Sequence, residues 1–129
     1  MIPTPGAYLK CRRTAHGLAI EDVAGVLSTD PRIAHHERAE WIMRIEADIA
    51  PASWTTIVAL RQHFPFDLAV LERLSLIHLG MDLPPPRLCR ICGASDTGGI
   101  GLAVLPWAWA AADLCIGCSL PPAGEAAAA

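Results

Sequence analysis

The chain has 129 residues, of which 53% are hydrophobic and 18% are charged, and its formal net charge at pH 7 is −3. This length allows one compact domain with a small appendage, but not two domains of ordinary size. The slightly negative charge argues against a protein that coats nucleic acid or anionic membranes through charge alone.

The N-terminus does not have the layout of a secretory signal, because Lys10, Arg12 and Arg13 follow a start that is broken by prolines. We therefore expect a cytoplasmic protein with reduced thiols. The longest uncharged run, 97–112, is shorter than the roughly 20 residues of a membrane span and contains Pro106. The sequence thus predicts no contact with membranes.

The pattern before residue 81 predicts five short helices. The first begins at the cap candidate Thr4 and at Pro5, a residue favoured at the first helical position. Gly17 separates it from a second helix over about 19–27, where apolar residues recur at helical spacing and acidic residues occupy the first turn.

The segment "STDPR" at 28–32 is a strong stop and restart signal. The sequence leaves open whether 31–40 is a loop or a helix. Ser53 predicts the cap of a fourth helix over about 54–63. Asp67 predicts the cap of a fifth, which continues to a glycine at position 80.

Two segments, "GLAIEDVA" at 17–24 and "IMRIEADIAPASWTTIVALRQHF" at 42–64, resemble the phage-repressor (lambda-repressor-like) helix-turn-helix family. That family has a glycine before helix two, an alanine in helix two, and an Ile-x-x-Ile-Glu run that ends the recognition helix. The matching positions are Gly17, Ala24, Ile42, Ile45 and Glu46. The resemblance covers about 6–75 and implies a mainly α fold, a five-helix domain over 1–81, that binds DNA.

The chain departs from the family at two points. The interval between Ala24 and Ile42 is about eight residues longer than usual, which indicates an insertion at about 28–38 in the turn that sets the angle between helices two and three. The family's glycine after Glu46 is replaced by Asp48, which adopts tight turns less easily.

The resemblance also implies which residues contact DNA. The outward residues of the recognition helix would be Arg38, Glu40, Trp41 and Arg44, with His35 and His36 just upstream. Arginine can bond guanine and glutamate can accept from cytosine in the major groove. Phosphate contacts would come from Lys10, Arg12 and Arg13. The alternative interpretation of these charges is an ordinary solvated helix face.

A proline-rich linker at 82–88 precedes two Cys-x-x-Cys pairs separated by 22 residues. The four cysteines are Cys89, Cys92, Cys115 and Cys118. Four thiolates in two hairpins are typical of a closed tetrahedral site, so we expect one structural zinc ion in a module over 89–118. This module resembles zinc ribbons and treble clefs. Iron in a rubredoxin-like site remains open, and disulfides rank below both.

Three further features lie around these pairs. The run "LAVLPWAW" at 102–109 predicts short strands with Trp107 and Trp109 on one face. Cys11 is expected to be a small buried apolar residue. The tail at 119–129 has low complexity and is expected to be disordered.

An enzyme is the class that the sequence supports least, since it has no phosphate loop, nucleophile motif or suitably spaced carboxylate pair. The first remaining hypothesis is a small bacterial or phage transcriptional regulator that binds double-stranded DNA, as a homodimer in which the two tryptophans form the contact. The second is a zinc-stabilised protein-interaction module, an adaptor or inhibitor, that keeps the helix-turn-helix scaffold without binding DNA. The basic first helix favours the first hypothesis, whereas the insertion and the negative charge favour the second.

Overall fold

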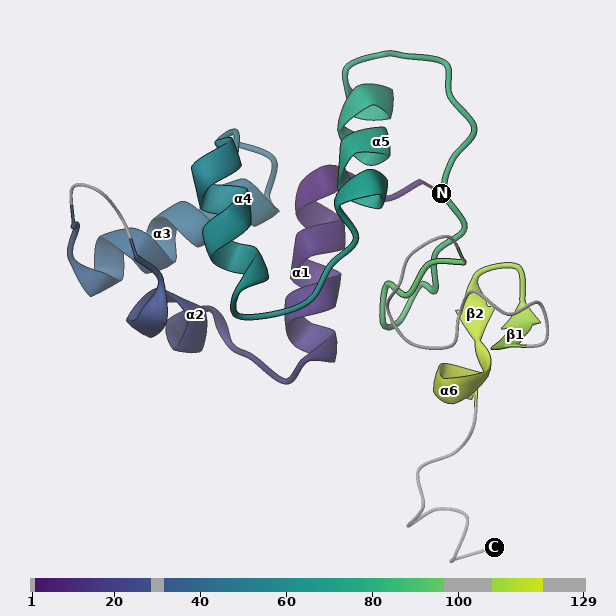
Figure 1. The fold of residues 1–129 in the computed structure, drawn as a ribbon, viewed down its shortest axis with the longest axis horizontal. Helices are drawn as coiled ribbons and strands as arrows, with labels where there is room; N and C mark the ends of the chain where they lie inside the picture. The colour runs from purple at the N-terminus through teal and green to yellow at the C-terminus, as the bar shows by residue number, and fades with distance from the viewer. Residues whose placement is uncertain (1, 29–31, 97–107, 120–129) are drawn as a thin grey trace, which may run out of the picture.

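The computed structural model of the chain describes residues 2–28, 32–96 and 108–119 (Figure 1). The described residues are mainly helical, with a small two-stranded sheet near the C-terminus, which confirms the expected mainly α class. The elements in chain order are α1 (Pro5–Ala15), α2 (Ile20–Val26), α3 (His35–Glu46), α4 (Trp54–Arg61), α5 (Leu68–His78), β1 (Trp109–Ala111), β2 (Leu114–Cys115) and α6 (Ile116–Ser119). No helix in these ranges is long and apolar enough to cross a membrane.

Three of the helix starts are fixed by side-chain caps, as the sequence predicts. Thr4 accepts a hydrogen bond from the amide of Ala7 at 3.2 Å, and Ser53 accepts one from Thr56 at 3.3 Å. The carboxylate of Asp67 accepts from the first free amides of α5. Each bond satisfies an amide that has no partner inside its own helix.

The structure settles the segment that the sequence leaves open. Residues 35–40 are helical, because α3 begins at His35, whereas 32–34 are not helical. Helix α2 ends at Val26, one residue earlier than expected, since Leu27 has an extended backbone. Helix α4 ends at Arg61 rather than near residue 63. Residues 29–31 of the predicted insertion lie outside the described part of the chain.

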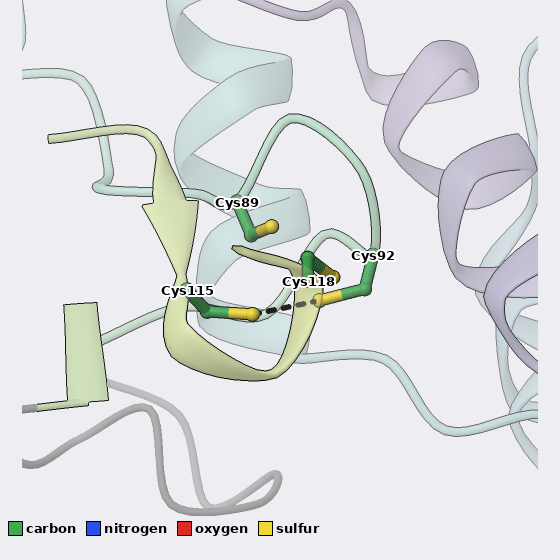
Figure 2. Close-up of side chains that lie close together, drawn as sticks. All are labelled: Cys89, Cys92, Cys115 and Cys118. Atoms are coloured by element: carbon green, nitrogen blue, oxygen red, sulfur yellow. Dashed lines mark hydrogen bonds between the residues drawn. The ribbon is translucent and has the colours of Figure 1, made fainter. Parts of the chain in front are cut away.

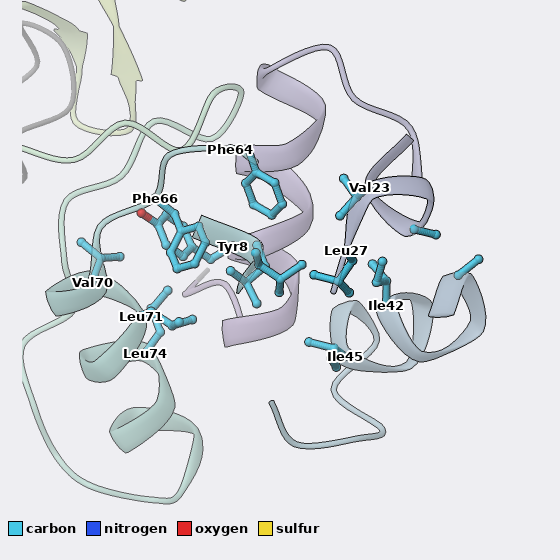
Figure 3. Close-up of a cluster of buried hydrophobic side chains, with 14 residues drawn as sticks. Tyr8, Val23, Leu27, Ile42, Ile45, Phe64, Phe66, Val70, Leu71 and Leu74 are labelled. Carbon is cyan, nitrogen blue, oxygen red and sulfur yellow. The ribbon is translucent and has the colours of Figure 1, made fainter. Parts of the chain in front are cut away.

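The core lies around α1, which packs against α3 on one side and against α5 on the other (Figure 3). Its centre is built from buried side chains of all five long helices and of the α4–α5 connection. They include Tyr8, Val23, Ile42, Leu60, Phe66 and Leu74. The hydroxyl of Tyr8 accepts a hydrogen bond from the amide of Asp67 at 2.8 Å, which ties the start of α5 to α1.

The chain reverses after α3 at Asp48. Its φ of 59° lies in the left-handed region, which aspartate tolerates better than most residues. The side chain compensates further, because its Oδ1 accepts a hydrogen bond from the amide of Gly6 at 2.8 Å. This bond joins the end of α3 to the start of α1.

Candidate metal centre and the exposed face of helix α3

The first cysteine pair lies in a tight backbone loop, 88–95, which we call the first knuckle. The amide of Gly93 donates to the carbonyl of Cys89, and the amide of Cys89 donates to the carbonyl of Ala94, both at 2.9 Å. Gly93 has a φ of 74°, a conformation that needs glycine here. The amide of Ala94 also points to the Cys92 Sγ at 3.4 Å, so the loop backbone holds the Cys92 thiol in place.

The second pair lies at the end of a short hairpin. Strands β1 and β2 pair antiparallel, with Trp109 opposite Cys115. Of the strand predicted over 102–109, only the last residue, Trp109, lies in β1, Ala108 does not, and 102–107 lie outside the described residues. Cys118 follows in α6. The hairpin joins the first knuckle through Arg90, whose amide donates to the carbonyl of Asp113 at 2.8 Å and whose guanidinium contacts the Asp113 carboxylate at 2.7 Å.

The four cysteines meet at one point (Figure 2). Their Sγ atoms all lie within 4.8 Å of one another, and none of the four is in a disulfide. The Sγ atoms of Cys92 and Cys115 are 3.7 Å apart. Metal–sulfur bonds of about 2.3 Å place neighbouring sulfurs of a tetrahedron about 3.8 Å apart. The donor set and its spacing therefore fit a metal ion with four thiolate ligands.

The surroundings of the thiols favour one thiolate before any metal binds. Burial opposes ionisation of Cys89, but hydrogen bonds from the backbone groups of Cys115, Cys92 and Ile91 outweigh it and lower its pKa to about 6. Burial, together with the thiols of Cys115 and Cys89, raises the pKa of Cys92 to about 11. Burial and the other three thiols also raise the pKa of Cys118. A metal ion must therefore displace protons from the last two thiols.

Two arginines of α1 were expected to contact phosphates, and the structure corrects this expectation. Arg12 and Arg13 are only 6% and 5% exposed. Arg13 forms a two-bond ion pair with Glu46, at 2.7 and 2.8 Å, and donates to the carbonyl of Leu18. Arg12 donates to backbone carbonyls. Both guanidinium groups point into the protein because their donors find partners there.

Arg38 was expected to face outward from the recognition helix, and that prediction is wrong. It is 5% exposed, and its Nε donates to the carbonyl of Ala24 at 2.7 Å. A second donor reaches the carbonyl of Ile33. Arg38 therefore joins α3 to the end of α2 and to the connection between the two helices.

The other predicted DNA contacts are exposed. Lys10, His36 and Trp41 lie at the surface, as does Arg44, which pairs with Glu40 one turn earlier at 2.8 Å. His35 lies 3.2 Å from the carboxylate of Glu21 on α2. The described part of the chain thus keeps Lys10, His35, His36, Glu40, Trp41 and Arg44 as surface candidates.

Two neighbouring residues of α1, Cys11 and Arg12, contact the first knuckle. The Arg12 Nη1 donates to the carbonyl of Cys92 at 2.6 Å, and the Cys11 thiol donates to the carbonyl of Ile91 at 3.1 Å. Cys11 is half-buried at this contact rather than inside the core. No local pattern predicts it, since each pair is 80 residues apart in the sequence.

The predicted tryptophan face can be followed at one residue. Trp109 is half-buried, and the guanidinium of Arg87 lies over its ring at 4.4 Å. Trp107 and the tail after Ser119 lie outside the described residues.

Comparison of the chain with protein-family models, with curated proteins and with solved structures finds no match.

Proposed function

We propose that the chain is a small DNA-binding transcriptional regulator in which α3 is the recognition helix. The observation that carries this proposal is the way α3 is held. Arg13 and Glu46 tie its last turn to α1, and Arg38 ties its first turns to α2. Buried charged groups fix the orientation of α3, while its other face stays exposed. A recognition helix needs such a fixed orientation to enter the major groove of DNA.

The exposed face defines a revised set of contacts. Glu40, Trp41 and Arg44 lie on the outer side of α3, with His36 one turn earlier. We propose that Arg44 and Glu40 read base edges and that Lys10 contacts a phosphate. The Arg44–Glu40 pair is exposed, so its separation on binding has a small cost. Few phosphate contacts per protomer favour a homodimer on paired half-sites.

We further propose that the cysteine cluster binds one zinc ion with a structural role. Four protein thiolates complete a tetrahedral shell, so no position remains for water or a substrate. Iron would occupy the same four-sulfur geometry. Metal analysis of the purified protein distinguishes the two, because a four-thiolate iron site is red whereas a zinc site is colourless.

A second function is favoured by the charge around α3. Acidic residues outnumber basic ones on α2 and on the exposed face of α3. The exposed acidic residues there are Glu21, Asp22, Glu37 and Glu40, whereas Arg44 is the exposed arginine of these two helices. Phosphates are repelled by such a surface. Under this alternative the chain is a protein-interaction module, an adaptor or inhibitor that binds a basic partner through α3 or a partner through the zinc module.

The deciding experiment is selection of duplexes from a random DNA pool by the zinc-loaded protein at two salt concentrations. We expect an enriched inverted repeat, lost in Arg44→Ala and kept in the control Arg73→Ala, an exposed arginine of α5. If the protein is folded and loaded with zinc but enriches no sequence, the DNA-binding proposal fails. The protein-interaction module then takes its place.

A further inference from the structure

The first knuckle is docked onto the helical part of the protein, and one side chain makes the central contact. Arg12, on α1, donates from Nη1 to the carbonyl of the metal-ligand residue Cys92 at 2.6 Å. Its Nε donates to the carbonyl of Pro65, in the α4–α5 connection, at 3.0 Å. One guanidinium therefore bridges the knuckle and the helical domain.

Close packing accompanies this bridge. A Cβ added to Gly93 would lie 2.9 Å from the Arg12 Cδ and 3.3 Å from the Cys11 Sγ, so the knuckle backbone rests directly on α1. On the neighbouring side the hydroxyl of Ser95 donates to the carboxylate of Asp67 at 3.3 Å. Leu88 packs against the helical core. The knuckle thus touches α1 and the start of α5 at several points.

Because Arg12 is charged and buried, its hydrogen bond to Cys92 matters for stability, and it is lost if the first knuckle leaves α1. Arg12 is 6% exposed, and none of the ion pairs among the described residues includes it. Backbone carbonyls therefore compensate its buried charge. If the knuckle opens, the Nη1 loses its partner, and a buried donor without a partner is costly.

We infer that Arg12 is a positioning residue for the metal centre, and that metal binding and the stability of the helical domain are coupled through it. This inference depends on metal binding at the cysteine cluster but not on DNA binding. Arg12 holds the Cys92 backbone in the orientation that brings its thiol to the other three. Metal loss frees the knuckle and removes one partner of a buried guanidinium in the last turn of α1.

Linkage makes the inference quantitative. If the docked knuckle binds metal more tightly than a free one, metal stabilises the docked helical domain by the same factor. Removal of the bridge must therefore weaken metal binding and also shrink the stabilisation that metal gives to the helices. If Arg12 had only a local structural role, its substitution would lower the stability of the helices equally with and without metal.

The first measurement is zinc affinity in competition with a chromogenic chelator, on the full chain under reducing conditions. We expect Arg12→Met to weaken zinc binding about tenfold, the effect of losing one hydrogen bond to a charged group. The matched control is Arg61→Met, since Arg61 also donates to a loop carbonyl, that of Phe66 at 3.0 Å, within the helical domain. Its zinc affinity should stay within twofold of wild type.

The second measurement is thermal unfolding of the helices, followed by far-UV circular dichroism with zinc bound and after its removal. In wild type, zinc removal should lower the Tm by about 5 °C or more. The same decrease is expected for the double variant Cys115→Ser/Cys118→Ser, which prevents metal binding without touching α1. In Arg12→Met the difference between zinc-bound and zinc-free protein should fall to half or less.

Two results would overturn the inference. One is an unchanged helical Tm in wild type after quantified zinc release, and the other is an Arg12→Met protein with wild-type zinc affinity and a wild-type difference in Tm. If Arg12→Met does not fold, Arg12→Lys takes its place, because a lysine keeps the charge but cannot bridge both carbonyls. Neither measurement uses DNA, so failure here is separate from failure of the proposed function.

Discussion

The Arg13–Glu46 ion pair is a residue-scale feature with a large expected effect. Both side chains are 6% exposed, and two hydrogen bonds join them. Because Arg13→Met leaves the carboxylate of Glu46 buried without its partner, we expect a loss of about 3–5 kcal/mol in the free energy of unfolding. Urea denaturation measures it.

The control for this change is the exposed ion pair Arg44–Glu40 on α3, the helix that also carries Glu46. Arg44 and Glu40 are 58% and 60% exposed, so Glu40→Gln should cost less than about 1 kcal/mol. Equal losses in Arg13→Met and Glu40→Gln would contradict the structural role that we assign to the buried pair.

The thiols give a second prediction at this scale, on the pH dependence of metal binding. Cys89, with a pKa of about 6, is already ionised at pH 7, whereas Cys92, with a pKa of about 11, and Cys118, whose pKa is also raised, hold their protons. Metal binding releases at least these two protons. The apparent affinity for zinc should therefore rise at least about 100-fold from pH 7 to pH 8.

This dependence is checked by zinc competition at several pH values, corrected for the protonation of the chelator itself. The slope of log affinity against pH gives the number of protons released. A slope near zero would mean that the thiols are already ionised without metal, and would contradict the raised pKa values of Cys92 and Cys118.

At the scale of elements, the approach of α1 to the end of α3 depends on a glycine. A Cβ at Gly6 would lie 2.6 Å from the carbonyl oxygen of Glu46, and backbone atoms cannot move aside cheaply. We expect Gly6→Ala to push the two helices apart and to lower the free energy of unfolding by about 1–3 kcal/mol. Chemical denaturation of the zinc-loaded protein measures the loss.

The matched substitution is Gly25→Ala in α2. The nearest atom to a Cβ there is the His35 Cε1 at 3.8 Å, an ordinary contact, and the position is exposed. Alanine is a better helix former than glycine, so Gly25→Ala should stabilise the protein by about 0.5–1 kcal/mol. If both variants shift stability in the same direction, the close approach at Gly6 is not the cause.

The helices themselves follow from short-range signals. Thr4, Ser53 and Asp67 each cap an amide two or three residues away, so their sequence positions suffice to predict where α1, α4 and α5 begin. No such signal marks the start of α3. Its N-cap is Ala34, which has no side-chain cap bond, and the helix is secured instead by Arg38 bonding to α2.

At the scale of the whole molecule, the proposed DNA binding should depend weakly on salt. The exposed basic residues of α1, of the described α2–α3 connection and of α3 are Lys10, Arg32 and Arg44. Each phosphate contact adds about −0.9 to the slope of log affinity against log salt, so we expect a slope of about −3 or shallower per protomer.

Titration of a selected duplex at several salt concentrations measures this slope. A value steeper than about −5 per protomer would require more cations than this surface offers, and would contradict α3 as the groove-facing element. The variant Lys10→Ala should make the slope shallower by about one unit without changing the selected sequence.

The sequence by itself determined the features that depend on neighbours along the chain. These are the helical class, three of the helix caps and the four-cysteine set, because each depends on residues a few positions apart or on paired thiols. Only the tertiary structure decided which arginines are buried and where the first knuckle docks. Arg12 and Cys92 are 80 residues apart, and a guanidinium becomes internal only when folding brings carbonyls to its donors.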